Sequence, residues 1–389
     1  MSYKKSIDLE YLSKNAFNMR WAEVAPDVIP LTAADSDLPI AKEIQTAIVE
    51  TAEHLLFPYG PAQGLLTFRE AIAQHYNHIK GSQISADQVL AVNSAATALQ
   101  DWCYHFINEG DEVLIPDPVD FLLGYCAEKA GGLVIRIPAE QYWNEEAWLS
   151  QLSVKTKAIF ICHPHNPLGF SYSKSDLEKI SSFAKKHELL LLSDEVWSDV
   201  ILTDSFVSMS AIDKDSWVVY GLSKGFGLAG LRIGALIGPS SNLLEVMESQ
   251  GYARTTQGVS TLSQIAATAA LQSLTARTSF IDQMSKNINY VYHRFEQEQQ
   301  FFECKKPSST FVIWLKHPAN WDTLELTKRI ENEARVKLVP GLPIWFGPGA
   351  NNHIRMSCAT SPEVLEEALN RIIAWTNALP NTPAPIDRL

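Results

Sequence analysis

The sequence lacks several features that would place it in other classes of protein. Its five cysteines are an odd number at irregular spacing and include no CxxC pair, which argues against a disulfide framework or a cysteine-based zinc site. It has no run of eighteen apolar residues, and its first residues contain no apolar signal core. Basic residues are the minority: 32 Lys and Arg against 44 Asp and Glu give a formal net charge of −12, which disfavours nucleic acid and anionic membranes as partners. Together these absences predict a reduced, cytoplasmic protein with no metal site.

The composition that remains is that of an ordinary globular protein. Of the 389 residues, 46% are hydrophobic and 20% are charged, which is material for more than one core. Short apolar runs alternate with amphipathic helical stretches between residues 88 and 239, and this alternation predicts βαβ units. We therefore expect an α/β protein: a large domain with a mainly parallel, mixed sheet flanked by helices, plus a smaller α+β domain.

The pattern changes along the chain and suggests where the domains begin and end. We expect residues 1–45 to form an N-terminal arm and part of the small domain, and residues 46–275 to form the large domain. The small C-terminal domain is expected over residues 276–380. We expect residues 381–389 to form a loose tail, because proline is frequent at that end of the chain.

Polar residues follow several predicted strands at the point where each strand ends. Ser94, residues 117–121, residues 163–166, Asp194 and Lys224 all have this position. Ligands bind at the carboxyl ends of the strands in open α/β sheets. The sequence therefore predicts that these residues form one site.

Lys224 is the candidate with the most specific surroundings. A lysine after a strand is usually a solvated surface residue, but this one stands in GLSKGFGLAGLRIG, after Ser223 and eight residues before Arg232. The glycines of this segment allow a close approach of the backbone. A buried amine loses its proton more easily, which Schiff-base chemistry needs, and an arginine can clamp a phosphate with its fixed donor fork.

This segment resembles the lysine motif of the aspartate-aminotransferase superfamily, the fold-type I pyridoxal-phosphate enzymes. The resemblance covers nearly the whole chain and rests on several motifs in the same order. It implies that Lys224 holds pyridoxal 5′-phosphate (PLP) as a Schiff base, beside Ser223. It also implies that Arg232 binds the phosphate of the cofactor.

Three further motifs extend the resemblance to the cofactor site. In LLLLSDEVWSD, Asp194 is implied to pair with the protonated ring nitrogen, which keeps the ring an electron sink. ICHPHNPLG is similar to the family's NPTG turn, so Asn166 is implied to donate to the phenolic oxygen of the cofactor. VNSAATALQ stands in the place of the phosphate loop, where Ser94 and the amides of Ala95 and Ala96 open a helix and are implied to hold the phosphate.

Two motifs imply a partner and a substrate. FPYGPAQGLLTFREAI resembles the family segment whose tyrosine reaches the phosphate of the neighbouring subunit. By that likeness Tyr59 implies a homodimer with shared active sites. ANNHIRMSCATS resembles the arginine strand of the small domain, so Arg355 is implied to bind the α-carboxylate of an α-amino acid through a bidentate pair.

The chain also departs from the family pattern. Where an aromatic residue normally stacks on the cofactor ring, this chain has Asp120 followed by Phe121, so either Phe121 stacks on the ring or an acid faces the site. Trp197 replaces the usual tyrosine of the Asp-Glu motif, and an indole N–H can donate but cannot accept or ionise. Gly221 stands where a serine is common.

Further acids and a histidine raise a hypothesis about the substrate. Asp35 and Asp37, together with Asp120, could form an acidic pocket that suits a cationic side chain such as a guanidinium. The alternative is that Asp35 and Asp37 belong to an ordinary turn with capping aspartates. His163 stands where asparagine is common and is a candidate acid or base near the substrate.

These features leave the reaction open among several alternatives. The segment LTAADSDLP is closer to the cystathionine β-lyase-like C–S lyases, whereas GLAGLRIG is closer to transaminases. We favour β- or γ-elimination, or elimination with ring closure, of a polar amino acid such as a hydroxyarginine, similar in type to the capreomycidine-synthase-like members. An aminotransferase that passes the amino group to a 2-oxo acid is the alternative, and a C–S β-lyase is the third. A non-catalytic sensor domain is disfavoured, because the lysine is retained.

Overall fold

A computed structural model describes residues 7–17, 19–140, 142–203, 205–239, 243 and 258–379. Seven of its strands form one sheet in the order β2-β8-β7-β6-β5-β3-β4, and all of them are apolar runs that the sequence predicts. β3, β4, β5, β6 and β7 run parallel, while β8 is antiparallel to both of its neighbours. The strands are β2 (Val89–Val92), β3 (Glu112–Asp117), β4 (Leu133–Pro138), β5 (Thr156–Cys162), β6 (Leu190–Asp194), β7 (Trp217–Gly221) and β8 (Gly234–Ile237).

The side chains of this sheet alternate between its two faces, as the period of two in a strand requires. Val113 and Ile115 of β3 belong to a core shared with α3, α4, α5 and α11. Leu114, between them, belongs to a second core shared with α6, α7 and α8. Because both faces are covered, the residues of these strands are mostly apolar, with few exceptions such as Arg136 in β4.

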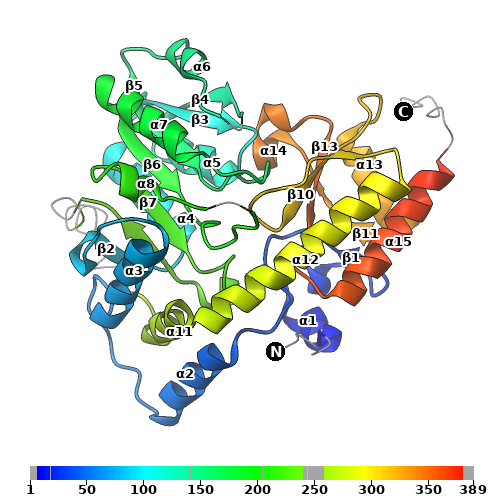
Figure 1. Cartoon of the computed structure of the whole chain (residues 1–389), viewed down its shortest axis with the longest axis horizontal. Coiled ribbons are helices and arrows are strands. Elements are labelled where there is room, and N and C mark those ends of the chain that lie inside the picture. The colour runs from blue at the N-terminus through cyan, green and yellow to red at the C-terminus, as the bar shows by residue number, and fades with distance from the viewer. Residues whose placement is uncertain are drawn as a thin grey trace.

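Helices lie around both cores (Figure 1). Most of them begin at a serine, aspartate or asparagine whose side chain accepts a hydrogen bond from the first turn, as at Ser94 before α4 and Ser173 before α7. The helices of this part are α2 (Lys42–Glu53), α3 (Leu66–Ile79), α4 (Ala95–Phe106), α5 (Phe121–Lys129), α6 (Glu145–Leu149), α7 (Lys174–Lys186), α8 (Met209–Ile212) and α11 (Thr261–Gln272).

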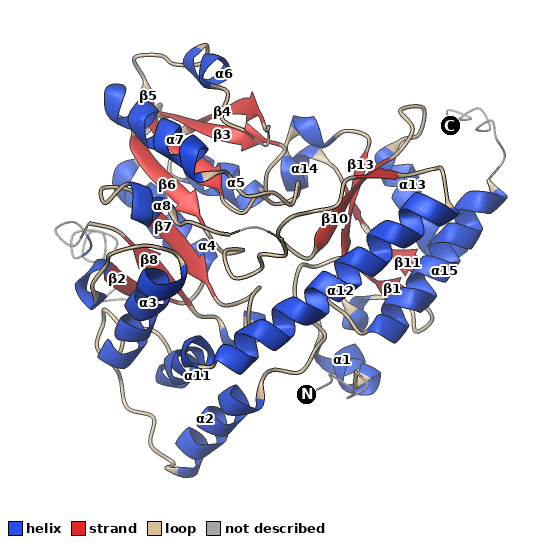
Figure 2. Cartoon of the chain, viewed as in Figure 1, coloured by secondary structure: helices blue, strands red, loops and turns tan. Residues whose placement is uncertain are grey.

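The C-terminal part is built on two smaller sheets, and Figure 2 shows their strands apart from the large sheet. One sheet is antiparallel, in the order β12-β13-β10-β9, and in the other β1 pairs in parallel with β11. The strands are β1 (Ile29–Pro30), β9 (Glu303–Cys304), β10 (Val312–Lys316), β11 (Val336–Lys337), β12 (Val339–Pro340) and β13 (His353–Ser357). The helices are α1 (Leu9–Asn15), α12 (Leu274–Glu298), α13 (Thr323–Arg329), α14 (Pro343–Phe346) and α15 (Pro362–Ala378).

The two parts are linked by the N-terminal segment and by α12, which runs across the molecule in Figure 1. Trp21 and Ile29 pack into the core of the C-terminal part, so the N-terminal segment joins residues that follow some three hundred positions later. Phe280 of α12 packs near Trp197, and Phe295 lies in the C-terminal core. This is the mixed α/β architecture that the sequence predicts. The predicted tail, residues 381–389, lies outside the described residues.

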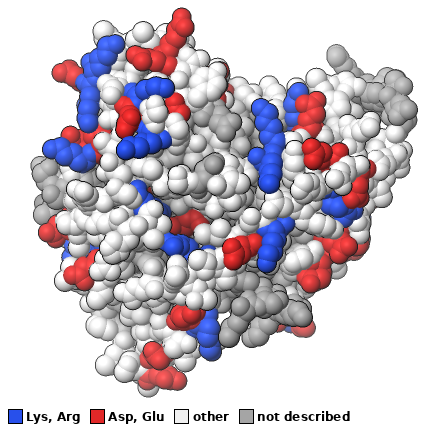
Figure 3. Space-filling model, viewed as in Figure 1, with Lys and Arg blue, Asp and Glu red and all other residues white. Residues whose placement is uncertain are grey.

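Charged side chains are spread over the molecule. On the face drawn in Figure 3, lysine and arginine alternate with aspartate and glutamate. None of the described helices combines the length and the apolar character that a membrane crossing needs. All five cysteines are free thiols.

Candidate active site

A cavity of about 170 Å³ lies at the carboxyl ends of the strands of the large sheet. It brings together residues that are far apart in the sequence, because β2, β3, β5, β6 and β7 all point their following loops toward it. Of the residues predicted to form the site, the cavity is lined by Ser94, Ala95, Ala96, Asp120, Asn166, Asp194, Trp197, Ser223, Lys224 and Arg232.

Lys224 lies on the loop that follows β7, with its amine inside the cavity. The Nζ atom donates a hydrogen bond of 2.5 Å to the carbonyl oxygen of Ala34 and lies 5.5 Å from the ring centroid of Trp197. Burial lowers the pKa of Lys224, although the carboxylates of Asp35 and Asp120 act in the opposite direction. Burial therefore makes the neutral, nucleophilic form of this amine more accessible than in a free lysine.

Asp194 is the last residue of β6, and its carboxyl group lies in the cavity. Its Oδ1 atom accepts a hydrogen bond of 3.1 Å from the backbone N–H of Val196. Burial raises the pKa of Asp194 to about 7, and the charge of Asp120 adds to this effect. Asp194 forms no ion pair with any described lysine, arginine or histidine, so a cationic partner in the cavity would stabilise its ionised form.

The start of α4 forms one end of the cavity. The Ser94 hydroxyl caps this helix by accepting from the backbone N–H of Thr97 at 3.1 Å, and the first amides of the helix, those of Ala95 and Ala96, have no partner within the helix. Arg232 follows the short 3-10 helix Ala229–Leu231 in a left-handed conformation with φ of 51°. The residue is exposed, and among the described residues its guanidinium donates to the carbonyl of Ala229. A Cβ atom at Gly234 would lie 2.9 Å from the nitrogen of Ala95, so the absence of a side chain lets β8 approach the helix start. Helix amides and an arginine could hold an anion at this end of the cavity.

Arg355, on β13, approaches the cavity from the C-terminal part. Its guanidinium donates to Oδ1 of Asn166 at 3.3 Å and to the carbonyl of Thr32 at 3.4 Å. The residue is only 8% exposed, its Nε atom is buried without a hydrogen-bond partner, and it forms no ion pair with a described carboxylate. A buried arginine without an anion is costly, so this position suits a carboxylate from a ligand.

Asp120 and Phe121 differ in where they point. Asp120 caps α5 by accepting from the backbone N–H of Leu122 at 3.1 Å, and its other oxygen accepts from Nδ2 of Asn166 at 2.9 Å. Phe121, the first residue of α5, turns away from the cavity and packs edge-on against Trp345, with ring centroids 5.6 Å apart. Of the two alternatives, the acid faces the site. The prediction that Phe121 binds the cofactor ring has no support in this placement.

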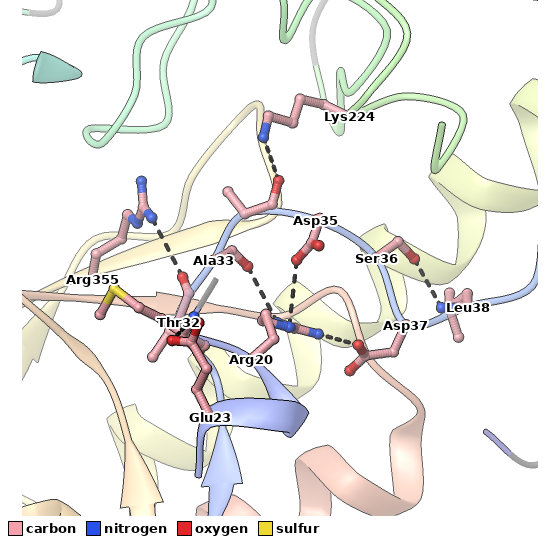
Figure 4. A network of polar contacts seen from close by, with 12 residues as sticks. Arg20, Glu23, Thr32, Ala33, Asp35, Ser36, Asp37, Leu38, Lys224 and Arg355 are labelled. Carbon is pink, nitrogen blue, oxygen red and sulfur yellow. Dashed lines mark hydrogen bonds and ion pairs between the residues drawn. The ribbon is translucent and has the colours of Figure 1, made fainter. Parts of the chain in front are cut away.

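The segment 32–38 lies beside Lys224, whose amine donates to the carbonyl of Ala34 (Figure 4). Arg20 organises it: the guanidinium donates to the carbonyl of Ala33 at 3.2 Å, pairs with Asp37, and lies 3.4 Å from Oδ1 of Asp35. The side chain of Asp37 is 3% exposed, and the ion pair with Arg20 balances its charge. The side chain of Asp35 is 38% exposed. Burial raises the pKa of Asp35, against the opposing charges of Arg20 and Lys224. The predicted acidic pocket is therefore reduced mainly to Asp35 and Asp120.

Comparison with known proteins decides the family. The family model for aminotransferase class I and II matches residues 26–372, which is most of the chain. This chain belongs to the class I and II aminotransferases.

Its relatives carry more than one activity in their names. An aspartate aminotransferase of Thermotoga maritima is 32% identical over 362 residues, covering 90% of this chain and 92% of that protein. The cystathionine beta-lyase PatB of Bacillus subtilis is 28% identical over 367 residues, covering 90% of this chain and 92% of that protein. The crystal structure of an aromatic aminotransferase from Pyrococcus horikoshii superposes with a TM-score of 0.83 at 28% identity, covering 90% of this chain and 96% of that one.

Members of this family are PLP-dependent enzymes, and the predicted family, enzyme class and cofactor are confirmed. The cavity fits PLP in its chemistry: helix amides that could hold an anion at the start of α4, an amine at Lys224, and at Asp194 an acid that has no cationic partner among the described residues. Within the described residues, no group of three or more histidine, cysteine, aspartate or glutamate side chains is arranged to hold a metal ion.

The structure places His163 outside the cavity of this class I and II aminotransferase. Nδ1 accepts from the backbone N–H of Tyr172 at 3.2 Å, and Nε2 bonds to the carbonyl of Val207 at 3.0 Å, so both ring nitrogens are occupied. The ring stacks on Phe206, and burial lowers the pKa of His163 to about 4. This arrangement gives the imidazole no free nitrogen for a substrate.

Arg20 is the residue of the site that the sequence did not reveal. Its partners Asp35 and Asp37 stand 15 and 17 positions later, on a segment without regular structure, so no periodicity connects them. A lone arginine in an irregular arm gave no signal. Only the tertiary structure shows that it supports the loop that contacts Lys224.

Proposed function

We propose that this enzyme is an aminotransferase that passes the amino group of an α-amino acid to a 2-oxo acid. The observation that carries the proposal is the meeting of Lys224, Asp194 and the anion site of α4 in one cavity, with Arg355 buried beside it and lacking an anion. The aspartate and aromatic aminotransferases among its relatives support the same reaction.

Each residue takes a role from its position. When bound, PLP withdraws electrons from the Cα atom of the amino acid attached to it. Lys224 acts as the general base that takes the Cα proton, because its lowered pKa makes the neutral amine available. Asp194, ionised by a cationic partner, would keep a proton on the ring nitrogen of the cofactor. Arg355 binds the α-carboxylate. Asn166 lies beside Arg355, from which it accepts a hydrogen bond, and its own bond to Asp120 holds it there.

The cofactor would be held mainly at its phosphate. The hydroxyl of Ser94, the amides of Ala95 and Ala96, and the guanidinium of Arg232 form that site. Ser223 adds a hydroxyl to the same cavity. Trp197 can donate from its indole N–H but cannot accept, so it tunes the site differently from the usual tyrosine.

Elimination is the second candidate, with or without ring closure, and a C–S β-lyase is one form of it. Asp35 favours it, because a carboxyl group with a raised pKa lies near Lys224, where it could handle a proton for a leaving group. Asp35 would also select a cationic side chain such as a guanidinium. Because Asp37 is paired with Arg20, less negative charge is available to attract a cationic side chain. We therefore rank elimination with ring closure behind transamination.

The reaction type can be decided by a keto-acid requirement. We expect the purified, PLP-loaded enzyme to convert amino acids from a panel, including aspartate, phenylalanine, cystathionine and hydroxyarginine, only when 2-oxoglutarate or another 2-oxo acid is supplied. Product amino acid would be measured by chromatography. Release of ammonia or pyruvate from cystathionine, or ring closure of hydroxyarginine, without any 2-oxo acid would replace this proposal with the elimination reading.

A second copy of the chain is the expected partner. Leu55, Leu56, Phe57 and Tyr59 form a continuous apolar run that is 58% to 85% exposed, which is unusual for a single soluble chain. We propose that this run lies in a homodimer interface and that Tyr59 reaches the phosphate site of the partner.

This interface predicts the effect of a charge. Phe57→Asp is expected to convert the protein to a monomer in light scattering coupled to size exclusion, and to lower its affinity for PLP. Val154→Asp is the matched control, because Val154 is fully exposed but stands apart from the run. If the wild-type protein is itself monomeric at micromolar concentration, the proposed homodimer interface is wrong.

A further inference from the structure

Behind the cavity lies a buried cluster of charged and polar side chains that the roles above do not use. The carboxylate of Asp199 bonds to Nε2 of His75 at 2.6 Å, to Nζ of Lys80 at 3.2 Å and to the hydroxyl of Tyr220 at 2.7 Å. All four residues are at most 5% exposed. A charge this deep is retained only where its partners are complete.

The bonds within this cluster are complete around both charges. Burial alone would raise the pKa of Asp199, but Lys80 and His75 lower it well below its usual range. The ammonium of Lys80 also donates to the hydroxyl of Ser198 and lies 4.4 Å from the ring centroid of Tyr220. The result is a rigid ion pair rather than a free acid.

The cluster joins α3, β7 and the loop after β6. His75 lies on α3 and Lys80 follows that helix, Tyr220 lies on β7, and Asp199 lies on the loop after β6. That loop also carries Trp197, whose ring faces the amine of Lys224. Asp199 therefore connects the loop after β6 with β7, the strand whose following loop carries Lys224.

Contact with the lysine loop is direct. A Cβ atom built on Gly225, the residue after Lys224, would lie 2.5 Å from the Cβ atom of Asp199. Only a glycine lets the loop rest against this residue, and its φ is not in the left-handed region, so backbone strain is not the reason for the glycine. Any displacement of Asp199 would thus shift the neighbouring backbone of Lys224.

We infer that Asp199 is a positioning residue: held by His75, Lys80 and Tyr220, it sets the place of the Lys224 amine relative to Trp197 and to the carbonyl of Ala34. Its bonds fix the loop after β6, and its side chain is the surface on which Gly225 rests. The inference rests on the proposed role of Lys224 as the reacting amine. It does not depend on whether transamination or elimination follows.

Gly225→Ala tests the contact directly. The added methyl group must displace Asp199 or the lysine loop, so we expect turnover of the PLP-loaded enzyme to fall about 10²-fold. In the cofactor-free full-length protein, competitive acetylation followed by mass spectrometry would report the pH midpoint at which the amine of Lys224 reacts. That midpoint should move by at least about half a pH unit. Gly230→Ala is the control, because a Cβ atom there meets nothing within 4 Å.

Tyr220→Phe tests the network with a milder change. It removes one bond to Asp199 and keeps the ring, and it should shift the acetylation midpoint of Lys224 in the same way. Tyr76→Phe is the matched control, because Tyr76 is as deeply buried, 5.3 Å from Tyr220, but its hydroxyl does not bond to Asp199. If Gly225→Ala and Tyr220→Phe have the same acetylation midpoints as Gly230→Ala and Tyr76→Phe, the cluster stabilises the fold but does not position the amine of Lys224. Because acetylation needs neither cofactor nor substrate, a failure of the proposed reaction would leave this result readable.

Discussion

Lys224→Ala is expected to lower turnover at least about 10⁴-fold and to remove the visible absorbance of PLP attached to the protein. The amine is the only described lysine that lines the cavity, and burial keeps it in its neutral form at a lower pH than a free lysine. Its loss removes both the covalent anchor and the base for the Cα proton. Absorbance spectra of the purified protein and initial rates with the best amino acid of the panel are the measurements.

Two controls separate chemistry from folding in this experiment. Lys214→Ala removes an exposed lysine near the start of β7 and should leave both the absorbance and the rate unchanged. Added ethylamine should restore part of the rate of the Lys224→Ala variant, because a small amine can take the place of the missing base. A variant that keeps its visible band and its rate would mean that another amine does the work assigned to Lys224.

Much of this cavity could be foreseen because it depends on local patterns. Lys224, Asp194 and Asn166 follow apolar strands, and the carboxyl ends of parallel strands meet at one edge of the sheet. Ser94 stands before a helical pattern and is a capping residue by type, so the start of α4 was visible in the sequence, whereas its role in holding an anion was implied only by the family resemblance. In each case a short segment determines the position, and the sheet assembles the segments.

Asp120 shows where a local rule, helix capping, decides between two alternatives that the sequence motifs left open. The sequence left open whether this acid or Phe121 faces the cofactor. An aspartate directly before an apolar helical stretch is a typical helix cap, and Asp120 does cap α5. That cap starts the helix at Phe121 and directs its ring toward Trp345, so capping determines which of the two residues lines the cavity.

The rest depends on tertiary contacts that no short pattern encodes. His163 looked like a candidate acid or base, but its ring is occupied by Tyr172 and Val207, which lie on other segments. Arg20 and the Asp199 cluster were not foreseen for the same reason. Asp199 gathers His75 from 124 positions earlier, and the only hint in the sequence was an aspartate close to the Asp-Glu motif.

Arg355→Met is expected to raise the KM for the amino acid substrate about 10²-fold while leaving the stability of the protein nearly unchanged. The binding loss corresponds to about 3 kcal/mol, at 1.4 kcal/mol for each factor of ten, as for a charge-assisted pair with a carboxylate. Stability should change little because, among the described residues, this buried arginine has no anionic partner and makes only long hydrogen bonds, at 3.3 and 3.4 Å. Arg355→Lys should not restore binding, because a single ammonium cannot provide the bidentate fork. Steady-state kinetics and urea unfolding are the measurements.

Arg20→Met is the matched control for that prediction, and its expected outcome is the opposite. Arg20 is as buried as Arg355 and also donates to a carbonyl of the segment 32–38, but it is paired with Asp37 and lies beside Asp35. Its removal leaves a buried carboxylate uncompensated, which should lower the free energy of unfolding by about 3 to 5 kcal/mol. If Arg355→Met destabilises the protein as much as Arg20→Met does and leaves KM unchanged, Arg355 is a structural residue and the α-carboxylate binds elsewhere. If the two variants separate as expected, the arginine that forms no ion pair with a described carboxylate is the one that binds the substrate.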